Sequence, residues 1–158
     1  MIEEFTTKDR KKEFDKIFKE KIVVFFKTQG FERHTKTSKR IFKDLGNGLS
    51  VFIFFEYKTF GHGFYDINIV YFDSEIGDVY DDEYLAMAQI KKPTIRGHNS
   101  IELNSSTDLW IEEMKMNIIP FIETNSTHKA ILNSDKFYFS KARENECKEL
   151  MKRKSEKQ

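Results

Sequence analysis

Residues 40–72 read RIFKDLGNGLSVFIFFEYKTFGHGFYDINIVYF, and this stretch has the clearest strand pattern in the chain. Asn47-Gly48 is a preferred pair for a type I′ hairpin turn, because both central positions of that turn need positive φ. Residues 49–57 place apolar side chains on both faces of a strand, which is typical of a central strand covered on each side. A looser, glycine-containing link then leads to a third strand over 64–72. The stretch therefore predicts a three-stranded antiparallel meander.

Helical periodicity flanks this meander. Before it, apolar residues at three- and four-residue spacing predict a helix over 8–29, and Gly30 stands where a left-handed residue ends a helix. After it, similar stripes predict helices over 106–125 and 140–154, and the second stripe is thin enough to indicate loose docking. Pro120 should kink or end the first of these two helices, because it has no backbone N–H. We therefore expect an α+β fold with an N-terminal helix, an antiparallel sheet of four to five strands and two C-terminal helices.

Length and composition are those of one folded domain. The chain has 158 residues, 39% of them hydrophobic and 34% charged, which excludes wholesale disorder. The longest purely apolar runs, 22–26 and 51–55, are far shorter than the roughly 20 residues of a membrane span, so we expect no membrane association. No linker or repeat divides the sequence, which predicts a single domain over 1–158. Cys147 is the only cysteine, and the N-terminus lacks a signal-peptide pattern, so we expect a cytoplasmic protein.

Opposite charges nearly cancel overall but are unevenly distributed. Lys and Arg number 27 against 26 Asp and Glu, so the chain has no global basic field that would favour nucleic acid. Residues 32–43 carry five basic residues and one acidic residue, whereas residues 66–85 carry seven acidic residues and no basic one. This separation predicts a basic side and an acidic side, and two ordinary solvated faces are the alternative.

Established patterns of catalytic and metal-binding residues do not occur in the sequence. The four histidines lack metal-ligand spacing, and no nucleophile elbow is present. The glycine pairs fall in hairpin links rather than before a helix, so they predict no phosphate cradle. The segment 62–66 departs from the RNA-recognition pattern, which makes nucleic-acid binding a poor hypothesis. We therefore expect no catalytic residue, no metal and no cofactor.

Two candidate sites remain. The first is an acidic loop that contains tyrosines, formed by Asp78, Tyr80, Asp81, Asp82, Glu83 and Tyr84. It suits a basic protein partner, because tyrosine supplies rigid contact area and carboxylates steer the encounter, and a solvated loop is the alternative. The second is a pocket on the sheet face near His62, Asp66 and Asn68, where two polar residues interrupt an apolar strand face. Such a pocket would belong to a small-molecule-binding protein or an enzyme.

Three stretches resemble a known family. They are FDKIFKE at 14–20 with GFER at 30–33, the run at 55–69, and IIPF at 118–121. Together they are similar to the bacterial family named domain of unknown function 4304, whereas the loop at 73–100 and the last helix match nothing in it. The resemblance implies a small intracellular bacterial α+β domain without an assigned activity. By analogy we expect a non-catalytic protein-binding module, such as the immunity partner of a bacterial toxin, and a homodimer stays open.

Overall fold

A six-stranded antiparallel sheet organises the computed structural model, which describes residues 4–156. Strand order in the sheet follows chain order, from β1 to β6. The strands are β1 Glu32–Arg33, β2 Arg40–Gly46, β3 Leu49–Lys58, β4 Phe64–Asp73, β5 Ala86–Ala88 and β6 Phe137–Tyr138. The α+β class and the antiparallel sheet are confirmed. The sheet has more strands than the four or five predicted, because β1 and β6 are two residues long and too short to show an alternating pattern.

The predicted meander corresponds to β2, β3 and β4. Asn47 and Gly48 have φ values of 55° and 81°, the positive values that a type I′ turn needs. β3 and β4 pair without a register shift from Leu49 opposite Asp73 to Lys58 opposite Phe64. These two strands form the centre of the sheet.

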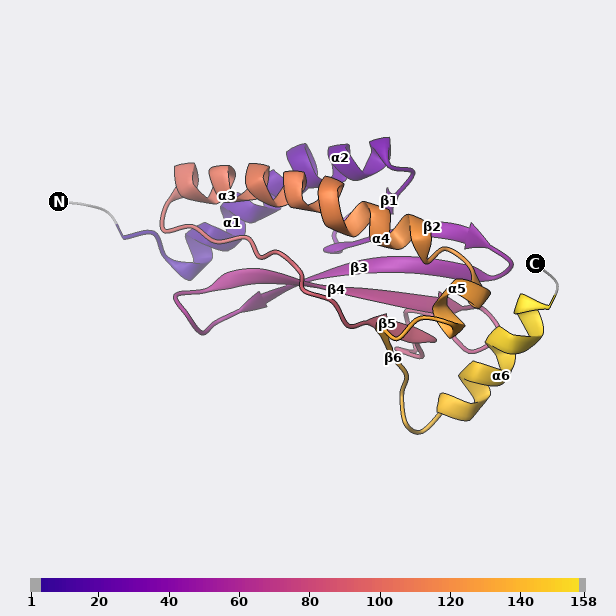
Figure 1. Ribbon diagram of the computed structural model, residues 1–158. Helices are drawn as coiled ribbons and strands as arrows, with labels where there is room; N and C mark the ends of the chain where they lie inside the picture. Colours follow the sequence, from indigo (N-terminus) through magenta and orange to yellow (C-terminus); the bar gives the residue numbers. More distant parts are fainter. Residues whose placement is uncertain (1–3, 157–158) are drawn as a thin grey trace.

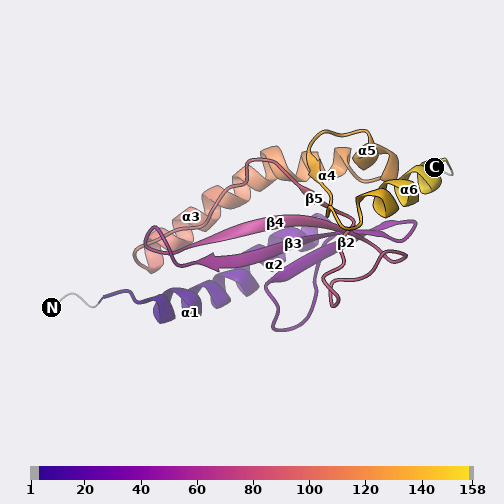
Figure 2. The same ribbon diagram turned by 90° about the horizontal axis from the view of Figure 1, so that it is seen from below.

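Two long helical segments lie side by side on one face of the sheet (Figure 1). Each is interrupted by a π-helical turn: α1 Thr7–Ile17, η1 Phe18–Ile22 and α2 Val23–Thr28 form the first, and α3 Ser100–Glu113, η2 Met114–Ile118 and α4 Ile119–Thr124 form the second. Figure 2 views the sheet from the side opposite these helices. The short α5 (His128–Leu132) and α6 (Glu144–Ser155) lie at the end of the sheet farthest from the start of α1 (Figure 1).

Several helix bounds differ from the sequence-based ones. The helix predicted over 106–125 begins at Ser100, because Asn99 caps it by accepting a hydrogen bond from the Glu102 N–H at 2.8 Å. Pro120 does not end this helix, since the π-helical turn before it shifts the bonding frame, and the Ile119 N–H donates to the Met114 carbonyl five residues back.

The last helix also differs from its prediction. It runs from Glu144 to Ser155 instead of 140–154. Its apolar stripe is thin, as the sequence indicates, but Cys147 and Met151 are fully buried in the main core. The expected loose docking is therefore not what the structure shows.

The two faces of the sheet differ in how they are covered. The side chains that face the long helices form the main core, which includes Ile41, Val51, Ile53, Phe55, Ile67, Ile69 and Tyr71. The opposite face carries a smaller apolar cluster, in which Phe52, Val70 and Phe72 pack with Val79 of the loop that follows β4. β3 is thus covered fully on the face toward the long helices and in part on the opposite face. No helix within residues 4–156 combines the length and apolar character needed to cross a membrane.

Candidate functional site

An open pocket of about 440 Å³ lies on the face of the sheet away from the long helices. Its floor is formed by Phe42, Phe52 and Phe72, one from each strand of the meander. The β2–β3 turn at 46–48 forms one wall, and residues 77–80 of the β4–β5 loop form another. The volume lies in the range of pockets that hold small ligands or a partner's side chain.

Aromatic rings dominate the lining of this pocket. Phe42 stacks on Phe52, its cross-strand neighbour, with ring centroids 5.2 Å apart. The His34 ring meets Phe52 edge-on at 5.3 Å and lies 5.3 Å from the Tyr80 ring. Phe52 is buried, whereas Tyr80 is 76% exposed. The pocket therefore has a fixed aromatic floor and one loosely packed aromatic side chain at its edge.

Carboxylates stand at the rim of the pocket. Asp44 Oδ1 accepts a hydrogen bond from the Gly46 N–H at 3.0 Å, and Asp78 Oδ1 accepts from the N–H groups of Tyr80 and Asp81 at 2.9 and 3.1 Å. Repulsion from the Asp78 carboxylate raises the pKa of Asp81, which is exposed beside it. Over residues 4–156, no lysine or arginine forms an ion pair with Asp44, Asp78 or Asp81. The rim thus carries carboxylates that have no basic ion-pair partner among residues 4–156.

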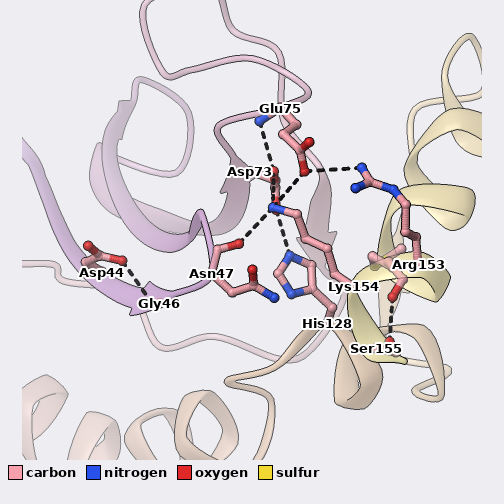
Figure 3. Close-up of polar contacts among 10 residues, drawn as sticks. Asp44, Gly46, Asn47, Asp73, Glu75, His128, Arg153, Lys154 and Ser155 are labelled. Atoms are coloured by element: carbon pink, nitrogen blue, oxygen red, sulfur yellow. Dashed lines mark hydrogen bonds and ion pairs between the residues drawn. The ribbon is translucent and has the colours of Figure 1, made fainter. Parts of the chain in front are cut away.

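A buried polar cluster holds two walls of the pocket together (Figure 3). Lys154 Nζ lies 2.8 and 3.0 Å from the two carboxylate oxygens of Asp73, and it donates to the Asn47 carbonyl at 2.7 Å. His128 Nε2 lies 2.6 Å from Asp73 Oδ2. Asn47 belongs to the turn that lines the pocket, and Asp73 directly precedes Ser74 of the lining. The cluster therefore fixes the β2–β3 turn against the start of the β4–β5 loop.

The charges of this cluster are stabilised by mutual hydrogen bonds. Burial alone would raise the pKa of Asp73, but hydrogen bonds from His128 and Lys154 outweigh it, and the pKa is lowered. Burial alone would lower the pKa of Lys154, but its hydrogen bonds to Asp73 and Glu75 raise it. The pair is therefore ionised at neutral pH. Asp73 and His128 have no exposed surface, so no substrate reaches them and we assign the cluster a positioning role.

The residues of the predicted acidic loop lie together but differ in their exposure and contacts. Asp78 and Tyr80 line the pocket, and Asp81 and Asp82 are exposed beside it. Glu83 forms an ion pair with Arg143, the residue before α6. Tyr84 is half-buried against the apolar cluster of the sheet face. The first four residues thus present a surface, while Glu83 and Tyr84 anchor the loop.

The structure does not gather the residues of the second predicted site. Asp66 and Asn68 lie half-buried on the outer face of β4, and Asp66 Oδ1 accepts a hydrogen bond from the Ile67 N–H at 2.9 Å. His62 is exposed in the β3–β4 link, where its ring lies 5.7 Å from that of His98. None of the three predicted residues lines the aromatic pocket, which lies toward the other end of the same sheet face. No group of three side chains suited to a metal ion occurs in the part of the chain that the structure describes.

Sequence reasoning missed His34, Phe42 and the buried cluster. Phe42, Phe52 and Phe72 stand at outward-facing positions of three adjacent strands, and this pattern is a signal that could have found the pocket floor. For the cluster no such signal exists, because its members are far apart in the sequence. No protein-family model, curated protein or solved structure matches this chain, so the resemblance to the domain of unknown function 4304 family stays a prediction.

Proposed function

We propose that this protein is a non-catalytic binding protein, and that its partner is a basic protein that docks on the acidic loop and the aromatic pocket beside it. The observation that carries this proposal is the pocket itself, which combines an aromatic floor with the carboxylates of Asp44 and Asp78, neither of which forms an ion pair with a lysine or arginine of residues 4–156. Protein interfaces derive most of their binding energy from anchors in such pockets, and charge around them accelerates association. An immunity-type role, with a basic toxin as partner, is one form of this function.

The charge of the pocket favours a basic protein over a nucleic acid. Phosphate groups would meet the carboxylates of Asp44 and Asp78, which repel them. Burial, with the neighbouring charge of Arg40, lowers the pKa of His34 below its usual 6.5, so this side chain adds no positive charge at neutral pH. His34 therefore does not offset the two carboxylates of the pocket lining.

The experiment is to capture the partner from the protein's own cell lysate at low salt, identify it by mass spectrometry, and measure association of the purified pair. In one variant, Asp81→Lys and Asp82→Asn together make the loop three charge units less negative, and asparagine suits the positive φ of 54° at position 82. The matched control, Glu112→Lys with Glu113→Gln, makes the same charge change on α3.

We expect the loop variant to slow association at least ~10-fold at low salt, and high salt to remove the difference. The α3 variant should associate within about twofold of the wild-type rate, as expected for a charge change away from the interface. Equal rates for the loop and α3 variants would reject the loop as the contact surface.

Small-molecule binding is the second candidate function, and the volume of the same pocket favours it. A thermal-shift screen with metabolites tests it. We expect a stabilising metabolite to lose its effect in the Phe42→Ala variant, since Phe42 forms part of the floor. An unchanged shift in that variant would place the ligand elsewhere.

A further inference from the structure

The aromatic residues of the outer sheet face fall into two groups. The first group comprises Phe54 and Phe64, and arginines of this chain lie over both rings. The Arg40 guanidinium is 4.5 Å from the ring centroid of Phe54, and the Arg96 guanidinium is 4.1 Å from that of Phe64. Both rings belong to outward-facing positions of β3 and β4. This face of the sheet therefore binds guanidinium groups on aromatic rings within its own fold.

The second group comprises the rings of the pocket, Phe42, Phe52, Phe72 and Tyr80. Among residues 4–156, no lysine or arginine lies over any of them. The described lining of the pocket also contains two carboxylates, Asp44 and Asp78, and no basic side chain apart from the neutral His34. The pocket thus has the aromatic surface and the negative charge that attract a cation, and no lysine or arginine of the described chain lines it.

The geometry favours arginine over lysine as the occupant. A guanidinium is planar, so it can stack on an aromatic ring while its N–H groups donate to carboxylates at the rim, and it is more weakly hydrated than an ammonium group. Asp44 comes from the end of β2 and Asp78 from the β4–β5 loop, so the two carboxylates reach the pocket from different elements. A side chain seated on the rings lies within reach of both elements. The volume of about 440 Å³ accommodates one such side chain with part of its backbone.

We infer that the pocket is a receptor for an arginine side chain of the partner protein. This inference rests on the proposed function and deepens it by naming the group that is recognised. The Asp73–His128–Lys154 cluster contributes by holding the β2–β3 turn and the start of the β4–β5 loop in place. The exposed Tyr80 is placed to fold over the guanidinium from the loop side.

The test uses blocked pentapeptides Gly-Gly-X-Gly-Gly, in which X is arginine, lysine or citrulline, titrated into the full-length protein and followed by backbone amide NMR shifts. Citrulline has nearly the shape of arginine but no charge. We expect the arginine peptide to bind weakly, with the largest shifts at residues 34, 42 and 78–80. The citrulline peptide should bind at least ~10-fold more weakly and the lysine peptide several-fold more weakly, because they lack charge and planarity respectively.

Three variants complete the experiment. Asp44→Asn with Asp78→Asn keeps the side-chain oxygens that accept the turn hydrogen bonds, so the protein should fold, but it should weaken arginine-peptide binding at least ~10-fold. Tyr80→Ala should weaken it as well. The matched control, Asp66→Asn, changes a carboxylate on the same sheet face outside the pocket lining and should leave binding unchanged.

The outcomes separate this inference from the proposed function. Any of four results would overturn the inference. They are equal binding of the arginine and citrulline peptides, stronger binding of the lysine peptide, no binding of the arginine peptide, and NMR shifts outside the pocket. If any of these results occurs while the Asp81→Lys, Asp82→Asn variant still associates more slowly with the partner, the proposed function stands and only the arginine inference fails. If the arginine peptide binds in the pocket but that variant associates at the wild-type rate, the proposed docking surface fails while the arginine site remains.

Discussion

Asp73 joins three segments that are distant in the sequence, because its carboxylate contacts His128 of α5 and Lys154 of α6 from the end of β4. Removal of the Asp73 charge leaves the buried Lys154 ammonium with only the half-exposed Glu75 as a charged partner. We therefore expect Asp73→Asn to lower the free energy of unfolding by about 3 kcal/mol or more, measured by urea denaturation. Glu75→Gln is the control: it removes a half-exposed partner of Lys154 and should cost less than ~1 kcal/mol. Equal losses would show that the buried contact is not the main source of stability.

Comparison of wild type with Asp73→Asn also tests how stability depends on pH. The pKa of Asp73 in the folded state is held below its usual 3.8 by hydrogen bonds from His128 and Lys154, which outweigh burial, and Lys154 also faces Glu75. The contribution of Asp73 is therefore complete above about pH 4 and is lost as pH falls below 3.8 through the lower folded-state pKa. Between pH 5 and pH 2, wild type should lose more stability than Asp73→Asn. Parallel losses would contradict this assignment.

At the scale of one element, the end of α2 shows how a local sequence signal determines structure. Gly30 has φ of 84°, its N–H donates to the Lys27 carbonyl, and the Phe31 N–H donates to the Phe26 carbonyl, which together form a Schellman motif. The rings of Phe26 and Phe31 meet at 5.3 Å. We expect Gly30→Ala to cost about 1 kcal/mol in urea denaturation, because alanine disfavours positive φ. Gly30→Asn should cost clearly less, since asparagine tolerates this conformation, and equal costs would point to a side-chain clash instead.

Elements of this kind account for most of what the sequence could predict. The Asn47-Gly48 turn, the meander and the Gly30 helix end depend on neighbouring residues, so their patterns are visible in the chain. The acidic composition of the loop after β4 is visible in the same way, and its role in partner binding stays a prediction. Lys154 was not predictable, because it stands in a charged segment typical of a solvated helix end, and it is buried only because α6 packs on α5 and reaches Asp73 at the end of β4. His34 likewise lies in a basic stretch that indicates a solvated face, and the fold brings it to the pocket.

At the scale of the whole molecule, one apolar core runs from the long helices to α6. It includes Trp110 of α3 and Cys147 of α6, and both side chains are almost completely buried. Polar contacts strengthen this connection, since Lys154 binds Asp73 of the sheet and Arg143 donates to the Ile76 carbonyl of the β4–β5 loop. We infer that α6 does not separate from the rest of the protein before the core unfolds.

This continuity predicts a single cooperative transition. Burial raises the pKa of the Cys147 thiol and shields it, so a brief pulse of thiol reagent should modify it only in unfolded molecules. We expect the urea midpoint from pulsed labelling of Cys147 to coincide with the midpoint from Trp110 fluorescence, as two-state unfolding requires. In Asp73→Asn both midpoints should move together to lower urea. Labelling of Cys147 at urea concentrations where Trp110 fluorescence is still native would mean that α6 opens on its own. The hydrogen bond from Lys154 to the β2–β3 turn would then break each time α6 opens, and the turn would be held in place only part of the time.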